Sequence, residues 1–139
     1  MPRHAIYAAR AYATSISNNY IEGFGATKTL GSYYGIGVTI QGEVGSTITG
    51  NRIFNFGGET NTNSTYYSIG IVQVNYKNGF VSVTGNLVRG KATPTSVGLN
   101  YNWGSRAGTS LTVTSSGNSV QNVGKPLLVS EGATVNAGF

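Results

Sequence analysis

The sequence has no cysteine and no aspartate, and charged residues make up only 9% of its 139 residues. Without cysteine, the chain can form neither a disulfide framework nor a thiolate metal site. Without aspartate, the four glutamates are the only carboxylate side chains, whereas a calcium site needs several clustered carboxylate ligands. We therefore expect no metal and no other cofactor.

Long apolar runs and helical periodicity are also missing. No apolar run approaches the length that crosses a bilayer, and no signal-peptide pattern begins at Met1. No segment of helical length shows the 3.6-residue period of an amphipathic helix. The glycine-rich segments lack the lysine and the strand–loop–helix context of a phosphate-binding loop. We expect no membrane insertion, no helical domain and no nucleotide site.

The formal net charge of +5 arises because acidic residues are scarce. The nine lysine and arginine residues are dispersed and form no run. Nucleic-acid-binding proteins usually concentrate such residues on one face, so we expect no nucleic-acid partner. Weak attraction to an acidic polysaccharide is at least as compatible with this charge.

A motif of two short strands around an asparagine corner occurs four times in the chain. Its clearest copy is residues 46–57, and the other copies are residues 14–25, 81–90 and 114–124. The corners are spaced by 32, 35 and 32 residues, and they are Asn19, Asn51, Asn86 and Asn118. A repeat of this period that is built from strands is typical of a β-solenoid.

A second repeated strand lies upstream of each corner. Residues 32–38 and 65–71 match closely, which places Tyr33 opposite Tyr66 and Tyr34 opposite Tyr67. Shorter copies occur at residues 4–8 and 95–99, and residues 125–130 would begin a further turn. Apolar residues alternate within these strands, which is the period of two expected for β-structure. Stacking the copies predicts two inward columns, Ile36 with Ile69 and Val97, and Ile53 with Val88 and Val120.

Three details of the repeat lead to local expectations. The corner asparagines have two compatible explanations, left-handed turn chemistry and an axial ladder of side-chain hydrogen bonds, and we favour turn chemistry. The alternation breaks step at residues 71–74, which predicts a bulge or a bend. Ser115 replaces the aliphatic residue of the other copies, which predicts looser packing in the fourth rung.

These observations predict an all-β chain that forms a single parallel β-helix domain over residues 1–139, with four to five rungs. The rungs are expected at residues 3–25, 31–57, 66–90 and 96–124, followed by a partial rung at residues 125–139. Segments 26–32, 58–64 and 91–95 are expected to be loops that cluster on one side. Because the strand pattern begins almost at once, the chain is expected to be a fragment of a longer protein.

The TGN-x-I corner at residues 49–53 and the GI-x-V strand at residues 35–38 resemble the right-handed parallel β-helix of the pectate-lyase-like superfamily. With abundant Gly, Ser, Thr, Asn and Tyr and little charge, the chain is most similar to bacteriophage tailspike and appendage proteins, in their C-terminal part. The resemblance covers about residues 4–131, and the right hand of the coil comes from it alone. It implies an extracellular homotrimer on the virion tail that binds, and often cleaves, host cell-surface polysaccharide.

Glycoside cleavage normally needs two carboxyl groups about 5–9.5 Å apart. The weak catalytic candidates are Glu22, Glu43 and Glu59, with Glu131 as the remaining carboxylate. Glu22 follows the inward Ile21 and should point outward, in a column without other carboxylates. Glu43 and Glu59 should leave the coil at different corners. We expect isolated surface glutamates and no catalysis within this segment, while a pair formed across subunits is left open.

Aromatic and amide side chains provide the candidate binding site. Matching tyrosine pairs on successive rungs could form a platform for sugar rings, with hydroxyls for polar contacts. The candidate carbohydrate-binding residues are Tyr33, Tyr34, Tyr66, Tyr67, Tyr76, Asn100, Asn102 and Arg106. The alternative, which we favour for the tyrosine pairs, is that they cover the edge of the coil or a subunit interface. Tyr101 and Trp103 are in phase with Val97 and Leu99 and are expected in the core.

Three functions remain as expectations. The favoured one is a tailspike-like attachment domain that binds host cell-surface polysaccharide and stabilises a trimeric spike. The main alternative is a polysaccharide depolymerase, either a hydrolase or a lyase, with carboxylates at a subunit boundary. The third is a purely structural domain that holds the trimer together.

Overall fold

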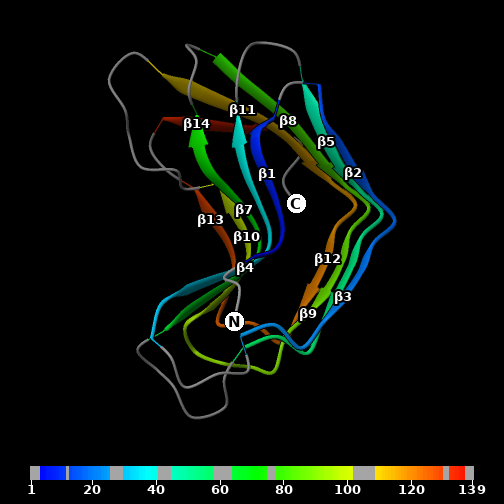
Figure 1. The fold of residues 1–139 in the computed structure, drawn as a ribbon, viewed down its shortest axis with the longest axis vertical. Coiled ribbons are helices and arrows are strands. Elements are labelled where there is room, and N and C mark those ends of the chain that lie inside the picture. Colours follow the sequence, from blue (N-terminus) through cyan, green and yellow to red (C-terminus); the bar gives the residue numbers. More distant parts are fainter. Residues whose placement is uncertain are drawn as a thin grey trace.

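The computed structural model describes residues 4–11, 13–25, 30–40, 45–57, 64–74, 78–101, 109–129 and 132–136, except for the side chains of residues 72 and 73. Within these ranges the chain has fourteen strands and no helix. Figure 1 shows the strands of successive rungs nearly over one another, so that each rung passes through three sheets in turn. The predicted parallel β-solenoid is therefore confirmed.

The described strands form three sheets in which every pairing is parallel. Sheet A consists of β1 (His4–Ala11), β4 (Ser32–Ile40), β7 (Thr65–Val74), β10 (Ser96–Tyr101) and β13 (Lys125–Val129). Sheet B consists of β2 (Ser15–Ser17), β5 (Ser46–Thr49), β8 (Asn78–Thr84), β11 (Ser110–Ser116) and β14 (Ala133–Asn136). Sheet C consists of β3 (Tyr20–Glu22), β6 (Arg52–Phe54), β9 (Leu87–Arg89) and β12 (Ser119–Gln121).

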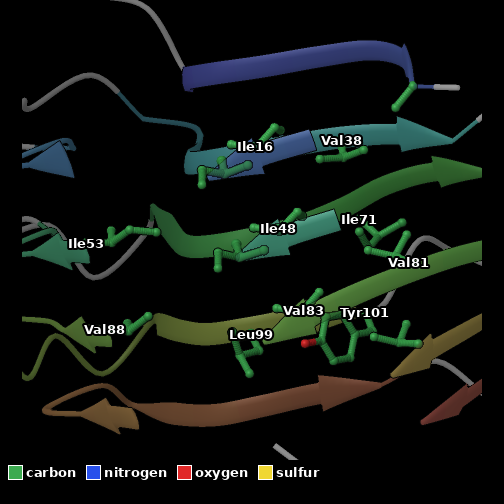
Figure 2. Close-up of a cluster of buried hydrophobic side chains, with 14 of the residues drawn as sticks. Ile16, Val38, Ile48, Ile53, Ile71, Val81, Val83, Val88, Leu99 and Tyr101 are labelled. Carbon is green, nitrogen blue, oxygen red and sulfur yellow. The ribbon is translucent and has the colours of Figure 1, made fainter. Parts of the chain in front are cut away.

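Buried side chains of successive rungs stack into columns in the interior. The predicted column of Ile53, Val88 and Val120 is confirmed by the pairing register. Figure 2 shows a second column, which the register assigns to Ile16, Ile48 and Val83. Full burial of one aliphatic side chain contributes about 1.5–3 kcal/mol. These columns are therefore a main source of the stability of the coil.

The other predicted column is wrong in its third member. Ile36 pairs with Ile69, but Ile69 pairs with Leu99, whereas Val97 pairs with Tyr67. A slip of two residues leaves every side chain on the same face of its strand, so alternation alone does not detect it. The same slip places Asn100 opposite Gly70.

The strands of sheet A bend near Gly35. A Cβ at Gly35 would lie 2.6 Å from the carbonyl oxygen of Ser68 and 3.2 Å from Ile53, so this position faces the interior beside the equally buried Ile36. Because the adjacent residues Gly35 and Ile36 both face the interior, the alternation of inward and outward side chains is reversed on the two sides of this pair. As a result Tyr33 is buried in the core, and Tyr34 lies on the outer face.

The bulge predicted at residues 71–74 is confirmed. Val38 pairs with Ile71, and the next residue of β4, Thr39, pairs with Gln73. One extra residue in β7 thus opposes β4, which lets both Ile71 and Val74 be buried.

Of the predicted loops, residues 91–95 contain no strand, while residues 26–29 and 58–63 lie outside the described residues.

The missing aliphatic side chain at Ser115 is compensated locally by a tyrosine. Ser115 and Tyr101 are both fully buried, and their hydroxyl oxygens are 2.9 Å apart. The Ser115 side chain is shorter than the aliphatic side chains at this position of the other rungs. The Tyr101 ring from β10 therefore extends to Ser115 inside the core. Tyr101 is a core residue, as predicted, and its burial raises the pKa of its hydroxyl.

A ladder of asparagine side chains runs along the corner between sheets B and C. The side-chain nitrogens of Asn19, Asn51 and Asn86 each donate to Oδ1 of the next corner asparagine, at 3.0, 3.0 and 2.9 Å. Their backbone N–H groups donate to the same oxygens, at 3.0, 2.9 and 3.0 Å. The last acceptor of the described ladder is Asn118.

Asn51 and Asn86 use their whole hydrogen-bonding capacity inside the protein. Their side chains are 0% and 1% exposed. Each side-chain nitrogen also donates to a backbone carbonyl of the preceding rung, that of Ile16 at 3.1 Å and that of Ile48 at 2.9 Å. A primary amide has two donor hydrogens and an oxygen that accepts two, so both side chains are saturated. A slip of register would leave several of these buried groups unpaired, at a high free-energy cost.

The left-handed turn conformation belongs to the residue before each ladder asparagine. The φ angles are 59° at Asn18, 69° at Gly50, 65° at Gly85 and 66° at Gly117. Glycine and asparagine adopt this conformation most easily. Favouring turn chemistry as the role of the corner asparagines was therefore wrong, because the preceding residue makes the turn while the corner asparagine forms the ladder.

We predict that Asn86→Ala lowers the free energy of unfolding by about 3 kcal/mol or more. The change removes the acceptor of the buried Asn51 backbone and side-chain N–H groups and the side-chain donor to the Ile48 carbonyl, and each such group left unpaired costs about 1–3 kcal/mol. Asn19→Ala is the matched control at the partly exposed end of the ladder, and it should cost less than about 1 kcal/mol. Urea denaturation measures both variants, and similar losses for the two would contradict the role of the ladder.

Candidate functional site

Of the candidate catalytic carboxylates, the structure describes only Glu22. It is exposed on the outer face of β3, as predicted. Its Oε1 accepts a hydrogen bond from the Asn55 side chain at 2.8 Å, and its Oε2 accepts one from the Tyr20 hydroxyl at 3.1 Å. Glu43, Glu59 and Glu131 lie outside the described residues. The described part of the chain therefore contains no carboxylate pair, and no cluster of metal-binding side chains was found in it.

Tyr33 and Tyr66 belong to the core. They are 2% and 0% exposed, and their rings stack with centroids 5.8 Å apart. The Tyr66 ring also lies against the backbone of Gly25, where a Cβ would come within 2.6 Å of it. The prediction that these two residues contact a sugar is wrong, because the bend at Gly35 turns them inward.

Tyr34 and Tyr67 lie on the outer face of sheet A, but their rings are engaged by neighbours. Tyr34 stacks on Tyr67 at 4.9 Å and on His4 at 5.0 Å, and its edge lies against Gly70. Burial raises the pKa of the Tyr34 hydroxyl, and the adjacent Tyr67 raises it further. Stacking of this kind favours the edge-covering role over the platform for sugar rings.

The remaining predicted binding residues add little exposed surface. Asn100 lies beside Gly70 on sheet A and is only 4% exposed. Three candidates, Tyr76, Asn102 and Arg106, lie outside the described residues, as does Trp103. The structure thus brings Tyr34, Tyr67 and Asn100 together, and both faces of the Tyr34 ring are covered.

The outer face of sheet B is a neutral surface covered by hydroxyl groups. One column contains Ser15, Thr47, Ser82 and Thr114, and the next contains Ser17, Thr49, Thr84 and Ser116. Some of these groups bond to each other, as where Thr47 donates to Ser15 at 3.1 Å. The described strands of this sheet carry no charged side chain.

Phe80 interrupts this polar face with an exposed ring. Val81 and Val83 point into the core, so Phe80 points outward and is 42% exposed. Ser46 pairs with Val81, which places Gly45 beside Phe80, and a Cβ on Gly45 would lie 3.7 Å from the Phe80 Cβ. Because Gly45 has no side chain, this flank of the ring stays open.

A shallow depression of about 210 Å³ lies beside Phe80 on this face. Its polar lining includes the side chains of Thr47, Ser82, Thr112 and Thr114. An apolar ring next to several hydroxyls can hold a sugar ring by its C–H face while bonding to its hydroxyl groups. The alternation within residues 79–83 already indicates that Phe80 points outward. Phe80 was not among the predicted binding residues, because those aromatic residues were chosen mainly at matching positions of the repeat.

The outer face of sheet C carries two arginine–aromatic pairs. The Arg52 guanidinium carbon lies 5.3 Å from the Tyr20 ring centroid, and that of Arg89 lies 5.4 Å from the Phe54 centroid. Tyr20 and Phe54 meet edge to face at 5.8 Å. Desolvation raises the pKa of the Tyr20 hydroxyl, and its hydrogen bond to Glu22 raises it further. From the sequence, Glu22 was expected in an outward column without other carboxylates, and these arginine–aromatic pairs were not predicted.

Comparison of the chain with models of known protein families, with curated protein sequences and with solved structures gave no match. A search of the described residues for a helix that is long and apolar enough to span a membrane also found none.

The two buried tyrosine hydroxyls lead to a prediction about stability. Tyr66 has no hydrogen-bond partner for its hydroxyl among the described residues, whereas the Tyr101 hydroxyl is bonded to Ser115. We predict that Tyr66→Phe raises the free energy of unfolding by up to about 1 kcal/mol and that Tyr101→Phe lowers it by about 1–2 kcal/mol. Thermal unfolding of both variants tests this, and an equal loss in the two would show that the Tyr66 hydroxyl is satisfied.

Proposed function

We propose that this chain is a carbohydrate-attachment domain that binds cell-surface polysaccharide on the outer face of sheet B. The observation that carries the proposal is the depression beside Phe80, where an open ring flank adjoins hydroxyl side chains. Sugars present both apolar C–H faces and many hydroxyl groups, so they complement such a surface. The absence of charge on the described strands of this sheet favours a neutral sugar unit there.

The rungs extend this surface along the solenoid axis. Equivalent positions of neighbouring strands are about 4.8 Å apart, and the hydroxyl columns continue on both sides of Phe80. A polymer of sugar units could therefore contact several rungs at once, with Phe80 fixing the position of one unit. Contacts repeated along a chain raise the overall affinity of individually weak sites.

The finer proposal is a tailspike-like domain on the virion tail that acts as a homotrimer. It is supported by the parallel solenoid and by the apolar surface at the last described rung. Val129 is 38% exposed, and Leu127 and Val135 are only partly buried there. Strand edges and apolar side chains in such a position need a covering partner, which subunit association would supply.

Catalysis is not part of the proposal. Both carboxylate oxygens of Glu22 accept hydrogen bonds from neighbouring side chains, and the described residues offer no second carboxylate beside it. A depolymerase would need a pair of carboxyl groups flanking the scissile bond.

We predict that Phe80→Ala weakens polysaccharide binding roughly tenfold, which corresponds to about 1.4 kcal/mol. Gly45→Leu should weaken binding similarly, because the added side chain would lie against the open flank of the Phe80 ring. The backbone of Gly45 is not left-handed, so leucine fits its conformation. Isothermal titration with neutral polysaccharides, chosen by screening the unmodified protein, measures these changes.

Tyr67→Ala is the matched control, since it removes an aromatic ring from the outer face of sheet A. Its affinity should stay within about twofold of the unmodified protein. Loss of binding in Tyr67→Ala, with Phe80→Ala unaffected, would overturn the assignment to sheet B and support the tyrosine platform on sheet A.

We predict that the protein in solution has a mass three times that of the 14.5 kDa chain. Light scattering at several concentrations measures this mass. A stable trimer at every concentration supports the spike, whereas a folded monomer would contradict the trimeric part of the proposal and leave the sugar-binding part intact.

A further inference from the structure

The outer face of sheet C holds two cationic groups at fixed positions. The register places Tyr20, Arg52 and Leu87 in one column, and Glu22, Phe54 and Arg89 in the next. Arg52 and Arg89 are therefore offset by one strand and by two residues along the strand. With about 4.8 Å between strands and about 6.7 Å between alternate residues, their Cα atoms lie roughly 8 Å apart.

Each guanidinium group is supported by an aromatic ring of the preceding rung. Arg52 lies over Tyr20 and Arg89 lies over Phe54, at 5.3 and 5.4 Å from the ring centroids. Cation–π contact holds the planar group in place while its N–H edges remain available to solvent. Such support lowers the conformational entropy that an arginine loses when it binds a ligand.

Neither guanidinium has an ion-pair partner within the described part of the chain. The nearby carboxylate is Glu22, and its two oxygens already accept hydrogen bonds from Asn55 and Tyr20. The two arginines therefore keep their donors for an external acceptor. Planar guanidinium groups bind carboxylates through two parallel hydrogen bonds, which gives both strength and orientation.

Leu87 supplies an exposed apolar surface next to the two arginines. It pairs with Arg52 across the strands and lies two residues before Arg89 on β9. Because the Arg52 guanidinium lies over Tyr20 on the preceding rung, it does not cover Leu87, which is 41% exposed. A sugar ring placed on Leu87 would lie beside both arginines.

We propose that the outer face of sheet C, between Arg52 and Arg89, binds carboxylate-bearing sugars of an acidic polysaccharide. This site is separate from the depression beside Phe80 and has its own ligand chemistry. It goes beyond the proposed function, since it adds an acidic-sugar site to the neutral one and stands whether or not sheet B binds a glycan. If both sites act, the corner of the asparagine ladder lies between them.

The same features argue against a nucleic acid as the occupant. Single-stranded nucleic acids bind by stacking bases on free aromatic faces next to a basic groove. Here the arginines cover one face of each supporting ring, and Tyr20 meets Phe54 edge to face. A pyranose ring instead offers C–H groups to the exposed Leu87 and a carboxylate to a guanidinium, so a carboxylate-bearing sugar suits the patch better.

Binding of the full chain to polygalacturonate tests the proposal. The same polymer after reduction of its carboxyl groups to alcohols is the neutral control ligand, and an oligothymidylate is the nucleic-acid control. We expect the protein to bind polygalacturonate, to bind the reduced polymer at least tenfold more weakly, and to lose affinity as salt is raised.

The double variant R52Q/R89Q should weaken polygalacturonate binding at least tenfold. The matched control is R10Q/K91Q, which removes the same net charge from exposed positions outside sheet C. It should keep the affinity for polygalacturonate within about twofold. A loss of affinity shared by both double variants would overturn the site, because it would show binding by net charge alone.

A third variant distinguishes loss of the binding site from loss of the fold. R52K/R89K keeps both charges but loses the planar donor geometry, so it should still bind several-fold more weakly than the unmodified protein, with unchanged circular dichroism. Full affinity in R52K/R89K, equal binding of the reduced polymer, or tighter binding of the oligothymidylate would each overturn the proposal.

Discussion

The hydrogen bonds of the asparagine ladder set the geometry on which the rest of the structure depends. Asn51 and Asn86 are buried and have every donor and acceptor engaged, so each fixes both the side chain and the backbone of the adjoining rung. Sheets B and C therefore leave the corner in the same register on every rung. The apolar column of Ile48 and Val83 inside, and the hydroxyl column of Thr47 and Ser82 outside, both follow from that register.

Repetition builds the scaffold, and departures from repetition create the candidate sites. On sheet A the repeated aromatic residues Tyr34 and Tyr67 stack on each other, and His4 covers the other face of the Tyr34 ring. On sheet B a single aromatic residue, Phe80, lies beside Gly45, so its flank stays open. On sheet C arginines follow aromatic residues along each column, which supports the guanidinium groups without neutralising them. The candidate binding groups of this solenoid thus lie where one rung differs from the next.

Spacing and alternation were sufficient to predict the solenoid, the pairing of Tyr34 with Tyr67 and the bulge at residues 71–74. They could not detect the slip that pairs Leu99 with Ile69, because a shift of two residues preserves the inward and outward phase. They also could not reveal that Tyr33 is buried, because Gly35 and Ile36 both face the interior, which reverses the alternation on the two sides of this pair. The open flank of Phe80 depends on a neighbour 35 residues earlier in the chain, which only the register identifies.

A crystal structure of the protein with a neutral oligosaccharide, chosen from the polysaccharides that it binds, tests the central claim most directly. Our account predicts a sugar ring against Phe80, with its hydroxyl groups bonded to side chains such as Thr47 and Ser82. An oligosaccharide bound to the Tyr34–Tyr67 stack instead, with sheet B empty, would contradict the claim that the sites arise where the repeat is broken.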